Sequence, residues 1–379
     1  MFKSYKIRLY PTKEQELLFY EHINASRYIW NYMIEQHKKE YEETGKHLSG
    51  FDMCKLITPL KNDGNHDWLR RVSVKTLQKA CKNLESAYIS FYKKNKGYPK
   101  FKSKKKDRKS FMTDTEHFYF VDKKYLFLPK IGKVKYKTDY NVPLNTRKFS
   151  NVTVFLDINK WFVTASFECE KQVLAGDFTM GIDLGIKDLA IVAFNDKKIV
   201  YHNINKSSKI KKIEKRIAYY NRSMSRKYVC SMSNHGYYKV SNNMKKEIIK
   251  IQKQYKRLRD IRTNYIHQVT KSLVNLYPSA IIMEDLDIVG LLKNKRMSKM
   301  ILNQCFYKFI TFIKYKCDNN GIDFIQVPTN FPSSKMCSNC GNIKKELKLS
   351  NRIYYCDVCG SIIDRDYNAA INLMKYQYN

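Results

Sequence analysis

Four of the ten cysteines form two Cys-x-x-Cys pairs near the end of the chain, separated by fifteen residues. They are Cys337, Cys340, Cys356 and Cys359, and a glycine follows each pair. Two such pairs on tight turns can surround one metal ion tetrahedrally, so the spacing predicts a structural zinc ribbon over residues 337–359. Because four thiolates leave no open coordination position, we expect Zn²⁺ to stabilise the fold rather than to catalyse.

The other six cysteines lack this spacing, and we interpret them as core or incidental thiols. They are Cys54, Cys81, Cys169, Cys230, Cys305 and Cys317. Ten cysteines in 379 residues, four of them clustered, favour a metal site in a reducing compartment over a disulfide scaffold. The N-terminus lacks the apolar core of a signal peptide, and no stretch approaches the roughly 18 apolar residues of a membrane span. We therefore expect a cytoplasmic protein with no membrane partner.

The chain carries 71 Lys+Arg against 35 Asp+Glu, a formal net charge of +36. Charge of this size repels itself in a compact chain unless a polyanion lies beside it, and nucleic acid is the commonest one. The excess is +16 over residues 1–175 and +20 over 176–379, of which +15 falls on 205–262. Segment 93–109 has ten basic residues and one acid, and we interpret it as a phosphate-contacting loop; a solvated flexible linker is the alternative.

Hydrophobic periodicity predicts several domains, with an overall class of multidomain α/β plus β. Capping-box spacing at Thr12 and Gln15 begins one helix, a second covers 73–94, and together they make a helical module over 11–109. Alternation in 152–156 and 161–167 predicts a hairpin, which with a strand in 1–10 makes a barrel-like unit of 1–10 and 110–172. After residue 176, strands alternate with long helices, including one that keeps an apolar face from Ile251 through Tyr255 to Leu276, as in an α/β domain.

Two acids lie in predicted core strands, where apolar residues are usual, and a third lies at the start of the last predicted helix. Asp183 lies inside one predicted core strand, Glu284 ends another, and Asp366 begins the last helix. A buried carboxylate costs several kcal/mol unless it is paired or binds a cation. Three of them could converge on two Mg²⁺ ions, the arrangement that hydrolyses phosphodiesters.

Each acid also has a simpler interpretation. Asp183 could belong to a turn, Glu284 could pair with an arginine of the long helix, and Asp366 or Asp364 could only cap the last helix. Three further acids lie close by in sequence and are weaker candidates, namely Asp188, Asp285 and Asp287.

Four segments, "GIDLGIKDLA", "IIMEDL", "SSKMCSNCG" and "DRDYNAAINL", resemble the motifs of the TnpB family, RNA-guided endonucleases of insertion sequences related to compact type V CRISPR nucleases. The resemblance implies an RNase H-like (RuvC) nuclease domain over 176–336 and 360–379 with the zinc ribbon as an insertion. It also implies a wedge β-barrel before it, interrupted by a helical recognition module. By motif position, the family's catalytic Asp, Glu, Asp triad, which binds Mg²⁺, falls on Asp183, Glu284 and Asp366.

The same resemblance implies an enzyme, a Mg²⁺-dependent endodeoxyribonuclease encoded by a transposable element. Its partners would be a guide RNA from the transposon end and target double-stranded DNA, cut next to a short target-adjacent motif. It would act in the prokaryotic cytosol, on the nucleoid when on target, as a monomer or as a dimer on RNA. The alternatives are an RNA-guided DNA-binding regulator that does not cut and a transposase that joins DNA strands.

Overall fold

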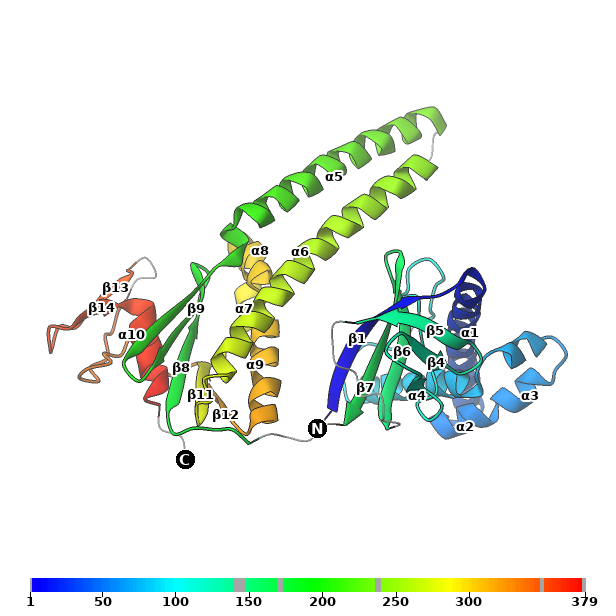
Figure 1. Ribbon diagram of the computed structural model, residues 1–379, viewed down its shortest axis with the longest axis horizontal. Coiled ribbons are helices and arrows are strands. Elements are labelled where there is room, and N and C mark those ends of the chain that lie inside the picture. Colours follow the sequence, from blue (N-terminus) through cyan, green and yellow to red (C-terminus); the bar gives the residue numbers. More distant parts are fainter. Residues whose placement is uncertain (1, 139–147, 169–172, 236–239, 348–350, 377–379) are drawn as a thin grey trace. The chain divides into compact units, whose positions relative to one another are not determined.

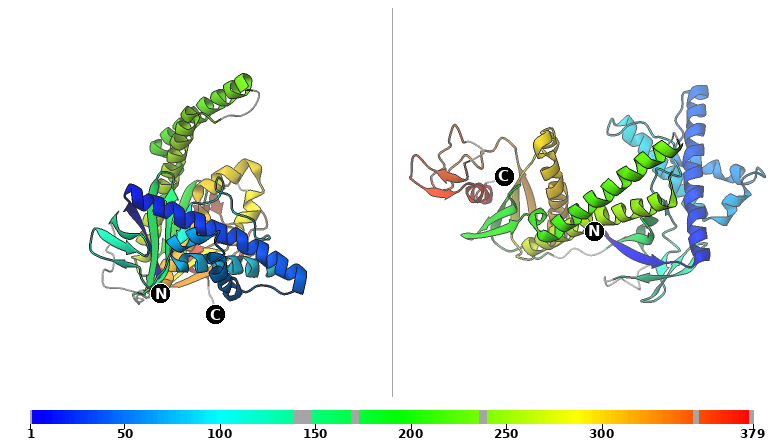
Figure 2. Two further views of the ribbon diagram at one scale, coloured as in Figure 1. Left: turned by 90° about the vertical axis from the view of Figure 1, so that its right-hand side faces the viewer. Right: turned by 90° about the horizontal axis from the view of Figure 1, so that it is seen from above.

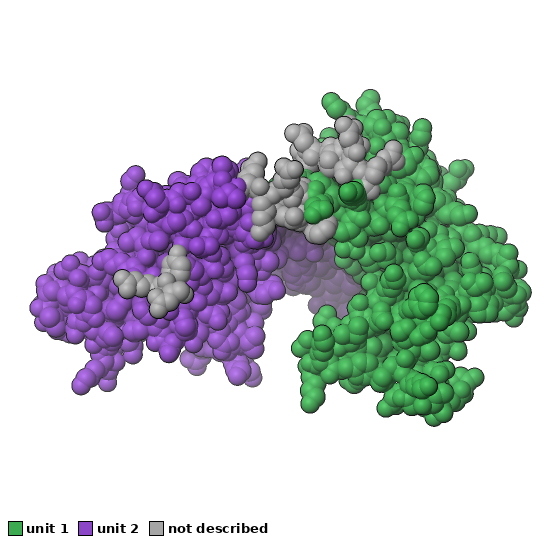
Figure 3. All heavy atoms as spheres, turned by 90° about the horizontal axis from the view of Figure 1, so that it is seen from below, with its two compact units in different colours: residues 1–170 green, residues 171–379 purple. Residues whose placement is uncertain are grey.

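The structure is a computed structural model that describes residues 2–138, 148–168, 173–235, 240–347 and 351–376. The chain divides into two compact units, residues 1–170 and 171–379 (Figure 3). Within the described residues no helix is both long and apolar enough to cross a membrane. The domain boundaries given above stay predictions.

An antiparallel sheet of seven strands dominates the first unit, in the order β2-β6-β7-β1-β5-β4-β3 (Figure 1). Its strands are β1 (Phe2–Tyr10), β2 (Ser110–Met112), β3 (Tyr119–Phe120), β4 (Tyr125–Leu128), β5 (Gly132–Lys137), β6 (Phe149–Asp157) and β7 (Lys160–Glu168). The predicted hairpin is β6–β7, and side chains alternate along β7 between the core and the outside. The predicted N-terminal strand is confirmed, since β1 pairs with both β5 and β7.

Between β1 and β2 the chain forms a helical layer. It comprises α1 (Lys13–Thr44), α2 (Gly50–Lys55), α3 (Ile57–Lys61), the 3₁₀ helix η1 (Asp67–Arg71) and α4 (Val74–Tyr92). The capping box predicted at the start of α1 is present, with Thr12 accepting from the Gln15 amide and Gln15 reaching back. Phe19 and Ile23 of α1 belong to the sheet core, whereas Ile29 and Met33 pack with α4. One helix therefore contributes to both cores.

The second unit contains a mixed sheet of five strands in the order β10-β9-β8-β11-β12. The strands are β8 (Thr179–Leu184), β9 (Asp188–Phe194), β10 (Lys197–His202), β11 (Ala280–Glu284) and β12 (Asp323–Val327). The first three pair antiparallel, while β8, β11 and β12 run parallel. The two predicted core strands that carry Asp183 and Glu284 are confirmed as β8 and β11.

Helices cover both faces of this sheet and extend beyond it (Figures 1 and 2). They are η2 (Ile204–Lys206), α5 (Ser208–His235), α6 (Asn242–Val274), α7 (Ile288–Leu292), α8 (Lys295–Gln304), α9 (Phe306–Asn320) and α10 (Arg365–Met374), and a small ribbon adds β13 (Ile353–Tyr355) and β14 (Ile362–Asp364). Helices α6 and α9 pack on one face and α10 on the other.

Helix α5 and the first part of α6 lie side by side and project from the sheet as a two-helix arm. The apolar face predicted for α6 is right at Leu258, Val269 and Leu273, which are buried, but Tyr255 and Leu276 are exposed. Tyr255 lines an open cavity with residues of α5, α8 and α9, and Leu276 follows the helix end at Val274.

Candidate active site and metal centre

Two neighbouring parallel strands carry the first two candidate acids at their carboxyl ends. The register pairs Ile282 of β11 with Gly181 of β8, and side chains two residues apart share a face. Glu284 and Asp183, each two residues further on, therefore extend the same row toward the strand ends. In parallel sheets ligands bind outside the carboxyl ends of the strands, and both acids lie there.

Helix α10 brings the third acid to the same place. It crosses β8 so closely at Gly181 that a Cβ there would overlap the backbone of Ala370 and Met374. Asp364 caps this helix by accepting from the Tyr367 amide at 2.9 Å, which leaves the Asp366 carboxylate available for another role. Asp183, Glu284 and Asp366 then line one cavity of about 610 Å³.

The carboxylates that line this cavity repel one another electrostatically. Burial, followed by the negative charges of Asp366 and Glu284, raises the pKa of Asp183 well above its ordinary value. Burial also raises the pKa of Glu284. Carboxyls whose ionised form is disfavoured in this way are stabilised by a cation, so the donor set fits divalent metal ions that prefer oxygen ligands.

The capping interpretation holds for Asp364, but the simpler interpretations of Asp183 and Glu284 do not describe the structure. Asp183 lies within β8, paired with Ile191, and not in a turn. Over the described ranges, Glu284 forms no ion pair with an arginine of α6.

The weaker candidates have other contacts and do not line the cavity. Asp188 Oδ1 lies 2.8 Å from His202 Nδ1. Asp285 Oδ1 accepts from Gln326 Nε2 at 2.9 Å. Asp287 caps α7.

The rest of the cavity lining was not predicted. It contains the segment 329–335, which follows β12, and four basic side chains: Lys187, Lys335, Arg352 and Arg365. Arg352 Nη1 lies 3.8 Å from Asp366 Oδ2. The only sequence signal for this set is the basic residue that directly precedes Asp366 in the motif "DRDYN". The cavity therefore presents carboxylates to a cation and basic groups to an anion.

The four predicted cysteine ligands cluster, with their sulfur atoms within 4.8 Å of one another. The Sγ atoms of Cys337 and Cys359 are 3.7 Å apart, and those of Cys340 and Cys356 are 3.5 Å apart. A zinc tetrahedron with Zn–S bonds of about 2.3 Å has edges of about 3.8 Å. Hydrogen bonds from Ser361 lower the pKa of Cys359 to about 6, which favours the thiolate. This cluster fits a structural zinc site.

Both pairs end in the predicted tight turns. Gly341 and Gly360 have φ of 75° and 71°, in the left-handed region that glycine adopts without strain. Of the other cysteines, Cys81 and Cys317 are buried, and burial raises the pKa of Cys317 to about 12. Cys54 and Cys305 are half-buried and Cys230 is exposed, while Cys169 lies outside the described residues.

Buried asparagines of α10 tie the ribbon to the helix that carries Asp366. Asn368 accepts from the Ser338 amide at 2.9 Å and donates to the Met336 carbonyl at 2.6 Å. One turn later, Asn372 donates to the carbonyls of Ser333 and Met336, each at 2.7 Å. The ribbon, the 329–335 segment and α10 are thus held as one piece at the edge of the cavity.

The whole chain aligns with a chain of a cryo-EM structure of the Cas12f1–sgRNA–target DNA complex, with a TM-score of 0.55 and 13% identity over 99% of both chains. Three family descriptions match parts of the sequence: "Helix-turn-helix domain" over 1–46, "Probable transposase" over 163–295 and "Cas12f1-like, TNB domain" over 306–373. Residues 2–46 hold β1 and α1, so the structure has no helix-turn-helix there. The protein has a compact type V nuclease fold with a TNB domain of zinc-ribbon type.

Curated relatives narrow this class. A "Putative RNA-guided DNA endonuclease" of Streptomyces pristinaespiralis is 28% identical over 98% of this chain and 88% of its own length. InsQ of Escherichia coli K12, described in the same words, is 27% identical over 98% of this chain and 91% of its own. Cas12f1 of Sulfoacidibacillus thermotolerans is 27% identical over 57% of this chain and 50% of its own. The resemblance to the TnpB family that the motifs predict is thus confirmed by proteins that match nearly the whole chain.

Proposed function

We propose that this protein is an RNA-guided DNA endonuclease encoded by a transposon, which cuts double-stranded DNA next to a short target-adjacent motif. The observation that carries the proposal is the convergence of Asp183, Glu284 and Asp366 on one cavity. The names of the relatives and the net charge of +36 support nucleic acid as the substrate.

In this proposal the three acids are the metal ligands of a RuvC site that cuts by phosphodiester hydrolysis. When bound, two Mg²⁺ ions supply the activation of water and the stabilisation of the departing oxygen. Asp183, Glu284 and Asp366 hold the ions through their carboxylate oxygens, and their mutual repulsion is relieved in doing so. Lys187 and Arg365, on the same cavity, attract the phosphodiester of a single strand. One cavity of this kind would have to cut both strands in turn.

The finer architecture belongs to the same proposal. We assign 176–336 and 360–379 to an RNase H-like nuclease domain, 337–359 to its zinc ribbon, 1–10 and 110–172 to a wedge barrel and 11–109 to a recognition module. The mixed sheet with acids at the ends of its two central parallel strands supports the first assignment. The single sheet that joins β1 to β2–β7 around an inserted helical layer supports the last two.

The proposed partners are a guide RNA and target DNA. Base pairing would supply the sequence specificity while the basic surface holds phosphates, as in other RNA-guided effectors. Sequencing of the RNA that copurifies with the protein tests this: we expect one species with a constant part and a variable end that maps to a genomic target. Heterogeneous cellular RNA would contradict a dedicated guide.

Cleavage of a plasmid that carries target and motif tests the catalytic assignment. We expect Asp183→Ala and Glu284→Gln to lower the cleavage rate by a factor on the order of 10² or more, with guide-dependent binding retained. Asp285→Asn is the matched control, because it removes a neighbouring charge while keeping the oxygen that accepts from Gln326. Undiminished cleavage by the first two variants would overturn the assignment.

Strand transfer is a second candidate, because residues 163–295 match the description "Probable transposase". Joining needs a free 3′ end as nucleophile, whereas hydrolysis needs only water. A reaction supplied with labelled DNA ends separates the two by its products, joined or merely cut. Motif-dependent occupancy that is independent of Mg²⁺ and leaves no cut product would instead indicate a regulator.

A further inference from the structure

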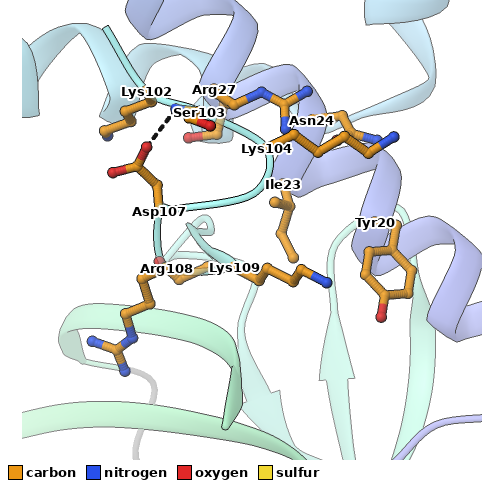
Figure 4. A pocket seen from close by; sticks show the side chains of 12 residues that line it. Tyr20, Ile23, Asn24, Arg27, Lys102, Ser103, Lys104, Asp107, Arg108 and Lys109 are labelled. Atoms are coloured by element: carbon orange, nitrogen blue, oxygen red, sulfur yellow. Dashed lines mark hydrogen bonds between the residues drawn. The ribbon is translucent and has the colours of Figure 1, made fainter. Parts of the chain in front are cut away.

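The first unit contains a separate cavity of about 320 Å³, between α1 and the basic segment 102–110 (Figure 4). One face of α1 contributes Tyr20, Ile23, Asn24 and Arg27, spaced three and four residues apart. Figure 4 shows Arg27, Asn24 and Lys104 along one side and Lys109 across from them, with Ile23 between. The volume lies near the lower limit of the roughly 300–1,000 Å³ typical of pockets for small ligands.

Trp30, which is buried, and Asn31, which is half-buried, hold part of the basic segment in place through hydrogen bonds to its backbone. Trp30 Nε1 donates to the Lys100 carbonyl at 3.0 Å. The Asn31 side chain forms two hydrogen bonds with the backbone of Lys102: it accepts from the amide at 2.7 Å and donates to the carbonyl at 3.0 Å. Asp107 closes the turn by accepting from the Ser103 amide. A ligand of this cavity would therefore meet a loop that is already ordered, which lowers the entropy cost of binding.

The cavity lining has five cations and a single acid. They are Arg27, Lys102, Lys104, Arg108, Lys109 and Asp107. In the part of the chain that the structure describes, none of the five cations forms an ion pair with a carboxylate. Such a set repels itself unless an anion enters.

The five cations differ in what they already contact. The Lys102 ammonium lies 3.5 Å from the ring centroid of Trp30, and burial lowers its pKa to about 8. Arg108 stacks on Phe155, with its guanidinium carbon 4.1 Å from the ring centroid, and Lys109 lies 5.6 Å from that of Tyr20. Within the described ranges Arg27 and Lys104 have neither a ring contact nor a hydrogen bond from their side chains. These two are the groups available to a ligand.

We infer that this cavity binds one unstacked nucleotide of a single-stranded segment. Its phosphate lies between Arg27 and Lys104, and its base lies against Tyr20 and Ile23 within reach of the Asn24 amide. Arginine and lysine are the usual phosphate partners, aromatic rings stack on splayed bases, and an amide can pair with a base edge. The inference rests on the proposed function only in taking nucleic acid as the partner, and the nucleotide belongs to either the RNA or the DNA.

Binding of short oligonucleotides to the 379-residue chain without Mg²⁺ tests whether Arg27 and Lys104 bind a phosphate. The probes are fluorescein-labelled heptamers of uridine and of thymidine, measured by anisotropy. Arg27→Gln with Lys104→Gln should weaken binding of one or both probes by roughly tenfold or more, because the two charged donors to the phosphate are removed. The matched control, Lys38→Gln with Lys39→Gln, removes two exposed charges from the same helix outside the cavity. An equal loss of oligonucleotide affinity in the Arg27/Lys104 variant and the Lys38/Lys39 variant would overturn the inference.

A heptamer without bases tests whether a base lies against Tyr20 in the cavity. Tyr20→Leu should weaken binding of the heptamer with bases about tenfold and leave binding of the abasic one unchanged, since the ring on which the base stacks is removed. Equal losses for both probes would exclude a base in the cavity. Arg27→Lys with Lys104→Arg should retain binding, and melting curves confirm that each variant folds.

The heptamer experiment distinguishes RNA from DNA as the source of the bound nucleotide. It also distinguishes this inference from the proposed nuclease function. Weakening only with uridine assigns the site to the RNA, and weakening only with thymidine assigns it to DNA. Because the assay contains no Mg²⁺ and no cleavage step, loss of the nuclease proposal would leave these results intact. An active nuclease whose heptamer binding ignores the Arg27, Lys104 and Tyr20 changes would overturn this inference alone.

Discussion

At the scale of single residues, the ionised carboxylate of Asp183 destabilises the folded protein. Its folded pKa lies above the value of an unfolded aspartate, so the folded chain binds the proton more tightly. Its contribution is therefore favourable at low pH and is lost as the pH rises through the folded pKa. At neutral pH without metal, the carboxylate is a cost that a cation would relieve.

We therefore expect Asp183→Asn to stabilise the metal-free protein at neutral pH while abolishing cleavage. About 1 kcal/mol would raise the melting temperature by roughly 2–4 °C in a unit of this size. The gain should shrink toward pH 4, where Asp183 is protonated, and Mg²⁺ should stabilise the wild type more than the variant. Calorimetry at several pH values, with and without Mg²⁺, measures this. A variant less stable than the wild type at pH 7.5 would show that Asp183 is structurally favourable.

Asp183 and Glu284 could be predicted as candidates because each breaks a local pattern that can be read along the chain. Asp183 and Glu284 interrupt apolar strands, and Asp366 begins a helix that Asp364 already caps. Arg352 and Lys187 break no local pattern, since a basic residue in an exposed segment is ordinary. They reach the cavity only through the packing of the ribbon and the β8–β9 connection, which depends on contacts between residues far apart in sequence.

At the scale of elements, the site depends on how closely α10 approaches β8. Gly181 permits this approach, because a Cβ would overlap α10 backbone at Ala370 and Met374. Backbone atoms cannot move aside like the end of a flexible side chain, so α10 would have to shift as a whole. The shift would carry Asp366 away from Asp183.

We expect Gly181→Ala to lower the melting temperature and to reduce cleavage far more than guide binding, at a cost of about 1–3 kcal/mol. The matched control is Gly97→Ala, since a Cβ at position 97 meets no atom within 4 Å. Thermal melting and plasmid cleavage of both variants measure this. Full cleavage by Gly181→Ala would mean that α10 tolerates the displacement or that Asp366 is dispensable.

The zinc ribbon acts on the same helix through buried hydrogen bonds. We expect Asn368→Ala to retain one Zn per chain but to lose about 1–3 kcal/mol of stability, because the Ser338 amide and the Met336 carbonyl lose a partner. Cys356→Ser should lose both zinc and cleavage. Metal analysis beside melting and cleavage separates the two variants, and cleavage by a zinc-free protein would show that the ribbon does not position Asp366.

Elements were predictable where the periodicity was strong and local. The β6–β7 hairpin alternates clearly, and the capping box marks the start of α1. The beginning of α6 at Asn242 was not found, because the small apolar core between α5 and α6 gives the first part of the helix a narrow apolar face. The short strands β3 and β4 were not resolved individually, because strands of two and four residues are shorter than a periodicity window.

At the scale of the whole molecule, the net charge of +36 is concentrated on particular elements. Segment 205–262, with a net +15, contains α5 and the first part of α6, the two helices of the arm. The arm has a small apolar core of Ile210, Ile213, Ile217 and Leu258, and many of its basic side chains are exposed. At 1.5 Å per residue, the 28 residues of α5 extend about 42 Å, enough to follow many phosphates of a nucleic acid.

We therefore expect the arm to contribute a measurable share of the salt dependence of guide RNA binding. Replacing the three exposed residues Arg222, Arg226 and Lys246 by glutamine should reduce the slope of log K against log salt by about 2 to 3, since each neutralised phosphate contributes roughly 0.7–0.9. Filter binding at several salt concentrations measures the slope. The control replaces Lys38, Lys39 and Lys46, which removes the same charge from the other unit. If both triple variants change the slope equally, the charge acts as a diffuse field; a larger change for the arm variant identifies the arm as a surface that binds RNA phosphates directly.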